Sequence, residues 1–383
     1  MGKDICVLDV RSDAVTVATG SGSGKGIISI SGIKSETYDG YGEGEWYNTA
    51  SLEDAVVKAF NTLPSHGNFD VLYVGVPSAF CEFYADENLT VLNEDSVITR
   101  NIADKAAVRG LEVLNKTRNV IQHCALGYRV DGGDVVYNPV GMSGRTMTTY
   151  NSYLPCKKGF YDAVDRIASA LNFTGTEYIS SAHAEGLTLL DDSYRAGGEV
   201  LVDFGFLECS LAGVRGDGLQ GLESVTTGSA IIAAELTERL DVDFYSALSL
   251  LGQIDLTDDF EQVSFYSLPK DGDVLKYRAS DINEIVRSCL REVAGEINNV
   301  FDNVADAQST RRIFATGNAF FNMKGAIKYL AKSMGRAITP LAPNVPGYDK
   351  PEYSSLISVM RQAHLRKSER SFFSKFINRL RRV

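Results

Sequence analysis

Two parts of the chain, one at the N-terminus and one near residue 200, repeat the same layout of short apolar runs separated by glycine-rich turns. The runs are residues 5–8, 15–19 and 27–33 in the first copy and residues 199–203 at the start of the second. The first run of each copy ends at an aspartate, Asp9 or Asp203. Apolar runs bounded by turn residues are typical of buried strands. The repeat predicts an α/β protein whose two halves have related layouts.

Helical spacing of apolar residues appears between these strands. It predicts helices over residues 52–63, 102–114, 160–171 and 280–304, with Thr99 as a cap for the second of them. Residues 70–77 and 312–316 are further strand candidates, and the second of these runs leads into a turn at Gly317. Strand, helix and strand in this order favour an α/β layer.

Composition restricts the class of protein. The chain has 383 residues, 44% of them apolar, which is enough for at least two cores of ordinary size. Six widely spaced cysteines form no CxxC pair, and the N-terminus has no signal-peptide pattern, so we expect reduced thiols and a cytoplasmic protein. The net charge of −11 argues against binding to nucleic acid, because phosphate binding needs a basic surface.

The C-terminal segment has the opposite charge. Residues 366–383 contain seven Lys or Arg and one Glu, a net charge of +6, so the preceding residues carry −17. At helical spacing its aromatic and aliphatic residues share one face and its basic residues the other. Such a helix can lie on an anionic membrane, whereas no apolar run in the chain is long enough to cross one. The predicted membrane-binding residues are Phe372, Phe373, Lys375, Phe376, Ile377, Arg379, Leu380, Arg381 and Arg382.

The same pattern has a second interpretation, in which the rings dock on the protein's own body, as most apolar helical faces do. One copy of the helix is expected to bind a membrane weakly and reversibly. Several linked copies would bind firmly, because each bound copy raises the effective concentration of the next.

Several segments resemble the FtsA family of bacterial actin homologues. The most specific is YRVDGGDVVYNPVGMSGRTM at residues 128–147. Residues 38–48 and 180–190 are also similar to segments of the family, and the basic terminus matches its membrane-targeting helix. The resemblance covers almost the whole chain. It implies an α/β, actin-like (ribonuclease H-like) two-lobed fold with an inserted FtsA-type, SHS2-like subdomain.

The resemblance also implies a division into subdomains. The first lobe (1A) consists of residues 1–83 and 160–196, and the inserted FtsA-specific subdomain (1C) of residues 84–159. The second lobe (2A) consists of residues 197–227 and 304–350, and its subdomain (2B) of residues 228–303. Residues 351–365 form a helix that returns to the first lobe, and residues 366–383 form a linker followed by the amphipathic helix.

In this family ATP with Mg²⁺ is held by glycine-rich loops, and the resemblance carries over to Asp9, Ser12, Asp203, Gly205, Gly228 and Gly317. The family's first loop, D-[IL]-G-[ST], has Arg11 in place of its glycine here. The second loop, D-[IV]-G-G-G-T-T-D, reads DFGFLECS, which places Glu208 where the triphosphate would lie. The adenosine motif and the third glycine pair are also incomplete. These departures predict weak or absent ATP binding and negligible hydrolysis, although the retained Asp9 and Asp203 leave the opposite case open.

The function implied by the resemblance is that of a cell division adaptor. It would polymerise into actin-like protofilaments, bind the C-terminal tail of FtsZ and tether the FtsZ ring to anionic lipids on the cytoplasmic face of the membrane at the septum. Two alternatives remain open at this stage. One is a divergent active ATPase of the actin-like superfamily, and the other is a cytoplasmic pilus-assembly protein of the PilM type.

Overall fold

The computed structural model describes residues 4–23, 27–64, 67, 69–257, 264–270, 273–305 and 312–380. For residues 94, 95, 269, 270 and 369–380 it describes the backbone only.

The first lobe is built on a five-stranded sheet with the order β11-β6-β1-β2-β3. Its strands are β1 (Asp4–Val10), β2 (Ala14–Ser23), β3 (Ile27–Thr37), β6 (Val71–Val76) and β11 (Gly175–Ser180). The strands β1, β2 and β3 are antiparallel neighbours, and β6 and β11 continue the sheet in parallel with β1. Helices α1 (Thr49–Asn61) and α4 (Lys158–Ala170) contribute to the core on one face, and α5 (Ser181–Leu189) and α11 (Ser354–Leu380) to the core on the other.

The second lobe repeats this topology strand for strand, in the order β18-β17-β12-β13-β14. Its strands are β12 (Glu199–Phe204), β13 (Cys209–Arg215), β14 (Gly218–Val225), β17 (Ile313–Gly317) and β18 (Ile338–Pro340). Again three strands are antiparallel and two continue in parallel with the first of them. The two lobes of related layout predicted from the sequence are thus confirmed.

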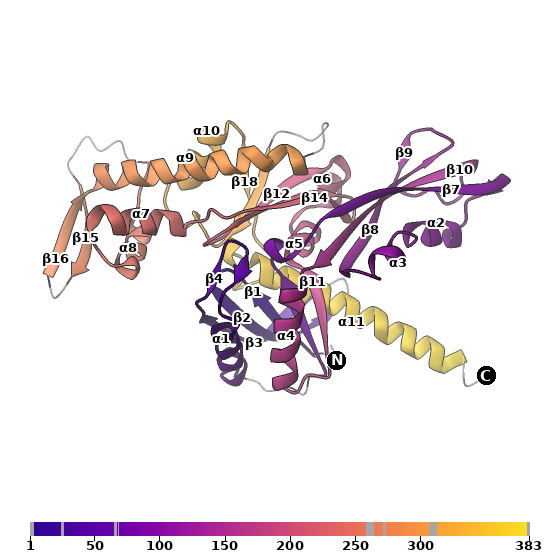
Figure 1. Cartoon of the computed structure of the whole chain (residues 1–383), viewed down its shortest axis with the longest axis horizontal. Helices are drawn as coiled ribbons and strands as arrows, with labels where there is room; N and C mark the ends of the chain where they lie inside the picture. Colours follow the sequence, from indigo (N-terminus) through magenta and orange to yellow (C-terminus); the bar gives the residue numbers. More distant parts are fainter. Residues whose placement is uncertain are drawn as a thin grey trace.

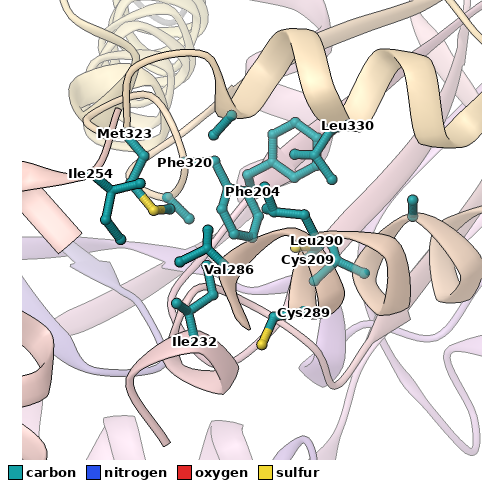
Figure 2. Close-up of a cluster of buried hydrophobic side chains, with 14 of the residues drawn as sticks. Phe204, Cys209, Ile232, Ile254, Val286, Cys289, Leu290, Phe320, Met323 and Leu330 are labelled. Atoms are coloured by element: carbon teal, nitrogen blue, oxygen red, sulfur yellow. The ribbon is translucent and has the colours of Figure 1, made fainter. Parts of the chain in front are cut away.

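The second lobe also contains a helical region that ends in a hairpin. Its elements are α7 (Ala230–Leu240), α8 (Phe244–Leu250), β15 (Phe265–Lys270), β16 (Asp273–Arg278), α9 (Ala279–Val304) and α10 (Ala326–Met334). A short helix, α6 (Asp192–Gly197), lies next to β13 of the sheet. Figure 2 shows the core of this lobe, where Phe204 of β12 and Phe320 pack among side chains of α7, α9 and α10. The rings of Phe204 and Phe320 meet edge to face, with their centroids 5.4 Å apart.

Residues between the halves of the first lobe form a separate four-stranded sheet with the order β7-β10-β8-β9. Its elements are β7 (Tyr84–Val97), α2 (Arg100–Ala107), α3 (Leu111–Leu114), β8 (Asn119–Val130), β9 (Val135–Val136) and β10 (Ser143–Cys156). Figure 1 shows this inserted sheet and the β15–β16 hairpin at opposite ends of the molecule, with the first lobe between and below them.

Two sequence predictions differ from the structure. The single helix expected over residues 102–114 is divided into α2 and α3, although Thr99 does cap α2 by accepting from the backbone N–H of Ile102 at 3.4 Å. The linker expected after residue 365 is not seen, because α11 continues without a break to Leu380. Figure 1 shows the C-terminal part of α11 extending away from the body.

Candidate functional site

Asp9 and Asp203 occupy corresponding positions in the two lobes. Asp9 lies in β1 opposite Gly75 of the parallel strand β6, and Asp203 lies in β12 opposite Thr316 of the parallel strand β17. Asp9 is buried, and burial raises its pKa to about 6, although Arg11 and a hydrogen bond from Ser355 lower it in part. The fold therefore brings one carboxylate from each lobe toward a shared interface.

Arg11 joins the lobes at this interface. It follows β1, in a turn where its backbone N–H donates to the carbonyl of Ala14 at 2.9 Å. Its Nη2 atom donates to both carboxylate oxygens of Asp203, at 2.9 and 3.0 Å, and the two side chains are 15% and 16% exposed. Burial alone would lower the pKa of Arg11, but the carboxylates of Asp203 and Asp9 raise it, so the guanidinium group stays charged.

Two further contacts cross between the lobes. The hydroxyl oxygen of Ser12 accepts a hydrogen bond from the backbone N–H of Leu207 at 3.1 Å. The hydroxyl of Tyr41 donates to a carboxylate oxygen of Glu208. Burial raises the pKa of Glu208 to about 6. The segment that the family resemblance assigned to a phosphate loop therefore binds the opposite lobe.

The start of helix α11 is held at the same interface. The hydroxyl of Thr316, in β17 of the second lobe, donates to Ser354 at 2.5 Å. The hydroxyl of Ser355 donates to Asp9 of the first lobe, also at 2.5 Å. The first two residues of α11 thus bind one lobe each.

The three glycines carried over from the family allow close backbone packing. Gly317 has a φ of +108°, and a Cβ atom there would lie 2.1 Å from a carboxylate oxygen of Asp203. A Cβ atom at Gly228 would lie 2.4 Å from the carbonyl oxygen of Gly205, and one at Gly205 would lie 2.4 Å from the carbonyl oxygen of Glu208. Such distances exclude any side chain at these positions without a shift of the backbone.

The six positions predicted from the sequence, Asp9, Ser12, Asp203, Gly205, Gly228 and Gly317, are all brought to this interface. Their role in nucleotide binding stays a prediction. Sequence reasoning identified Arg11 and Glu208 as departures from the family pattern but gave no partner for either. It singled out residues 38–48 and 180–190, which contain Tyr41 and Glu185, but gave neither residue a role, and it missed Ser355.

The cavity that remains between the lobes is small. Arg11, Ser78, Ser181 and Glu185 are among the residues that line it, and its volume is about 40 Å³. Each of these four side chains has a buried polar atom without a hydrogen-bond partner in the structure. At roughly 10–15 Å³ for one water, the cavity has room for about three. Ligand pockets are typically about 300 Å³ or more.

The charges around the cavity are also unsuited to a triphosphate. Burial raises the pKa of Glu185, and the neighbouring carboxylate of Asp203 raises it further. The guanidinium group of Arg11 is already paired with Asp203. It also interacts electrostatically with the carboxyl groups of Asp9, Glu185 and Glu208. A phosphate group would meet a bulky side chain and several acids in place of the bare amides that hold phosphates. The residues present do not fit ATP with Mg²⁺.

Among the residues that the structure describes, no group of three or more His, Cys, Asp or Glu side chains is placed to hold a metal ion. Likewise, no helix in the described part of the chain is long and apolar enough to cross a bilayer.

Comparisons with known protein families and with curated proteins gave no match. Solved structures do match over almost the whole chain. A PilM–PilN type IV pilus biogenesis complex is 10% identical, with 94% of this chain and 98% of that chain covered and a TM-score of 0.61. MreB 5 of Spiroplasma citri bound to AMPPNP is 8% identical, with 97% and 98% covered and a TM-score of 0.56.

The ethanolamine utilization protein EutJ of Carboxydothermus hydrogenoformans is 10% identical, with 94% of this chain and 90% of that chain covered and a TM-score of 0.52. The chain has the actin-like two-lobed α/β fold. At these identities the likeness shows the fold alone.

The predicted membrane-binding residues lie at the far end of α11. The helix backbone includes Phe372, Phe373, Lys375, Phe376, Ile377, Arg379 and Leu380, but their side chains are not described. Arg381 and Arg382 lie outside the described residues.

Proposed function

We propose that this protein is an actin-like membrane scaffold that does not depend on a nucleotide cycle. In this proposal the C-terminal part of α11 attaches it to the cytoplasmic face of the membrane, while the lobes present binding surfaces to other proteins. The proposal rests mainly on helix α11. Its N-terminal part packs against the body, and its C-terminal part projects away from the body.

The first half of α11 is firmly anchored. Leu356, Val359, Met360 and Ala363 are fully buried in the core against the first-lobe sheet. Buried side chains of this kind contribute about 1.5–3 kcal/mol each when they are large. The helix therefore leaves the body in a fixed direction.

The last described anchors come one turn later. Arg366 donates to the carbonyl oxygen of Tyr178 and to the side-chain oxygen of Gln122, both at 2.9 Å. Lys367 donates to the carbonyl oxygen of Asp4. Beyond them, residues 369–380 extend the helix by about 18 Å. This extension contains the three phenylalanines of the predicted membrane-binding face.

The chemistry of the extension supports attachment to anionic lipid. Partly inserted rings gain up to about 1.5–3 kcal/mol each, and each nearby basic residue adds about 1 kcal/mol at an anionic surface. One helix of this kind binds reversibly, so a scaffold of several copies is needed for firm attachment. Self-association into actin-like filaments would supply those copies.

The interlobe site supports the second part of the proposal, namely that ATP is neither bound nor hydrolysed. MreB 5 of Spiroplasma citri, which has this fold, binds AMPPNP in its solved structure. In this chain, by contrast, Arg11 and Glu208 contact the opposite lobe, and the cavity beside them has room for only about three waters.

The partner is proposed from the resemblance to the FtsA family. There the C-terminal tail of FtsZ docks on the region that corresponds to residues 228–303, which here contains α7, α8, the β15–β16 hairpin and most of α9. The protein would then link the FtsZ ring to the membrane at the division septum.

A second candidate is a pilus-assembly role of the PilM type, favoured by one observation. The PilM–PilN complex has a TM-score of 0.61, higher than the other neighbours described above. The projecting end of α11 favours the membrane scaffold over this alternative.

Co-sedimentation with vesicles tests the proposal. Without any added nucleotide, the intact protein should pellet with vesicles rich in phosphatidylglycerol and should stay largely in solution with pure phosphatidylcholine, because its basic residues need anionic headgroups. Raising the salt concentration should weaken the binding. Failure to pellet with anionic vesicles at low salt would refute the membrane scaffold.

A further inference from the structure

We infer that the guanidinium group of Arg11 takes the place of a divalent cation between the lobes, so that the protein's own side chain, and no bound ligand, holds them closed. The inference does not depend on membrane attachment. It explains why the residues at this interface suit neither a nucleotide nor a metal ion as they stand.

The first support is the arrangement of charges. Asp9 and Asp203 come from corresponding strands of the two lobes, and each acts electrostatically on the other or on Arg11. Carboxylates close together in a buried site disfavour each other's ionisation, and a nearby cation offsets this effect. Arg11 binds Asp203 directly, and the carboxyl groups of Asp203, Asp9 and Glu185 all raise the pKa of its guanidinium group. One nitrogen of the guanidinium group, Nη2, donates to both carboxylate oxygens of Asp203, and a planar guanidinium group is well suited to pairing with a carboxylate.

The second support is the space left beside Arg11. Mg²⁺ in proteins usually binds one or two carboxylates and keeps several of its waters. The cavity of about 40 Å³ has room for about three waters and is lined by Arg11 itself. With the arginine in place, a hydrated cation would have to displace a positive charge from the same carboxylates. Without the arginine, both the charge and the volume of its side chain would become available.

The start of helix α11 is connected to the bridge between Arg11 and Asp203. Ser354 binds Thr316 of the second lobe, and Ser355 binds Asp9 of the first. Because Asp9 also interacts electrostatically with Arg11, the start of α11 belongs to the same closed cluster. Because α11 is packed on the first lobe, a permanent bridge keeps the second lobe in a constant position relative to α11. A bridge that required a ligand would let that position vary with ligand binding.

The test compares melting temperatures of the full-length protein and an Arg11→Ala variant in chelator and in millimolar MgCl₂, at constant ionic strength. Arg11→Ala should melt well below the wild type in chelator, and Mg²⁺ should raise its melting temperature by at least about 3 °C, since a ligand stabilises the folded state that it binds. The wild type should not respond to Mg²⁺. Arg11→Lys, which keeps the positive charge, should not respond either.

Arg312→Ala is the matched control, because Arg312 forms a partly buried bond with Glu199 inside the second lobe, at 2.8 Å. Its melting temperature should be the same with and without Mg²⁺. The inference is refuted if Mg²⁺ leaves Arg11→Ala unchanged, or if it raises the melting temperature of the wild type or of Arg312→Ala equally. The Arg11→Ala variant could also purify in an unfolded state. In that case, refolding of the variant with Mg²⁺ but not with Na⁺ supports the inference, and a variant that stays unfolded with either ion refutes it.

Discussion

A chain that ends at Ser368 is expected to remain in solution when the intact protein pellets with anionic vesicles, with at least about a tenfold loss of bound fraction. The truncation removes the three phenylalanines and five of the seven basic residues of the C-terminal segment. Their combined transfer energy of several kcal/mol is the whole of the proposed attachment. Because the last described anchors are Arg366 and Lys367, the melting temperature should stay close to that of the intact protein.

Two full-length variants separate the contributions. Changing Phe372, Phe373 and Phe376 to Ser keeps the net charge, and changing Arg379, Arg381 and Arg382 to Gln keeps the rings. Each should reduce the pelleted fraction. If the truncated chain still pellets, or if it melts about 5 °C or more below the intact protein, the rings belong to the body and the attachment is wrong.

Asp203→Ala is expected to lower the free energy of unfolding by about 3–5 kcal/mol, because it leaves the buried guanidinium group of Arg11 without its partner. Urea denaturation followed by circular dichroism measures this loss. Removing both charges together, as Arg11→Met with Asp203→Leu, should recover most of it, since a buried pair replaced by apolar groups of similar volume is often neutral.

An exposed ion pair supplies the comparison. Lys158 and Asp162 lie one turn apart in α4, with side chains 82% and 53% exposed. Asp162→Ala should change the free energy of unfolding by no more than about 0.5 kcal/mol. Equal effects of Asp203→Ala and Asp162→Ala would contradict the importance given to the interlobe bridge.

The layout of the two lobes could be predicted because it is written in local patterns. Apolar runs, turns and helical spacing occur in the same order in both halves, and β1 and β12 were each expected to lead to an aspartate. The cap at Thr99 was predictable for the same reason, since a cap depends on residues within one turn.

The break between α2 and α3 could not be predicted from apolar spacing, although Gly110, which lies at the break, disfavours a helix locally. Leu111 and Leu114 continue the apolar spacing, which favoured one helix over residues 102–114. The structure brings Gly110 so close to the inserted sheet that a Cβ atom there would lie 2.2 Å from the hydroxyl oxygen of Tyr153. This close contact depends on β10, a strand that contains Tyr153 and lies more than forty residues away, so helical periodicity cannot predict it.

The interlobe site was predicted only in part. The departures at Arg11 and Glu208 were visible against the family pattern, and they indicated damage to a nucleotide site. The bridge from Arg11 to Asp203 joins residues 192 positions apart, so one sequence could not reveal it. The pairing changes the interpretation of Arg11 from an obstacle in a phosphate loop to a contact that holds the lobes together.

Calorimetric titration of the purified full-length protein with ATP and Mg²⁺ tests the central claim most directly, because the claim is that this protein's own side chains close the interlobe site. We expect no saturable heat up to about millimolar ATP, which corresponds to binding weaker than about −4 kcal/mol. A saturable isotherm with a micromolar dissociation constant, lost in Asp203→Ala, would contradict it.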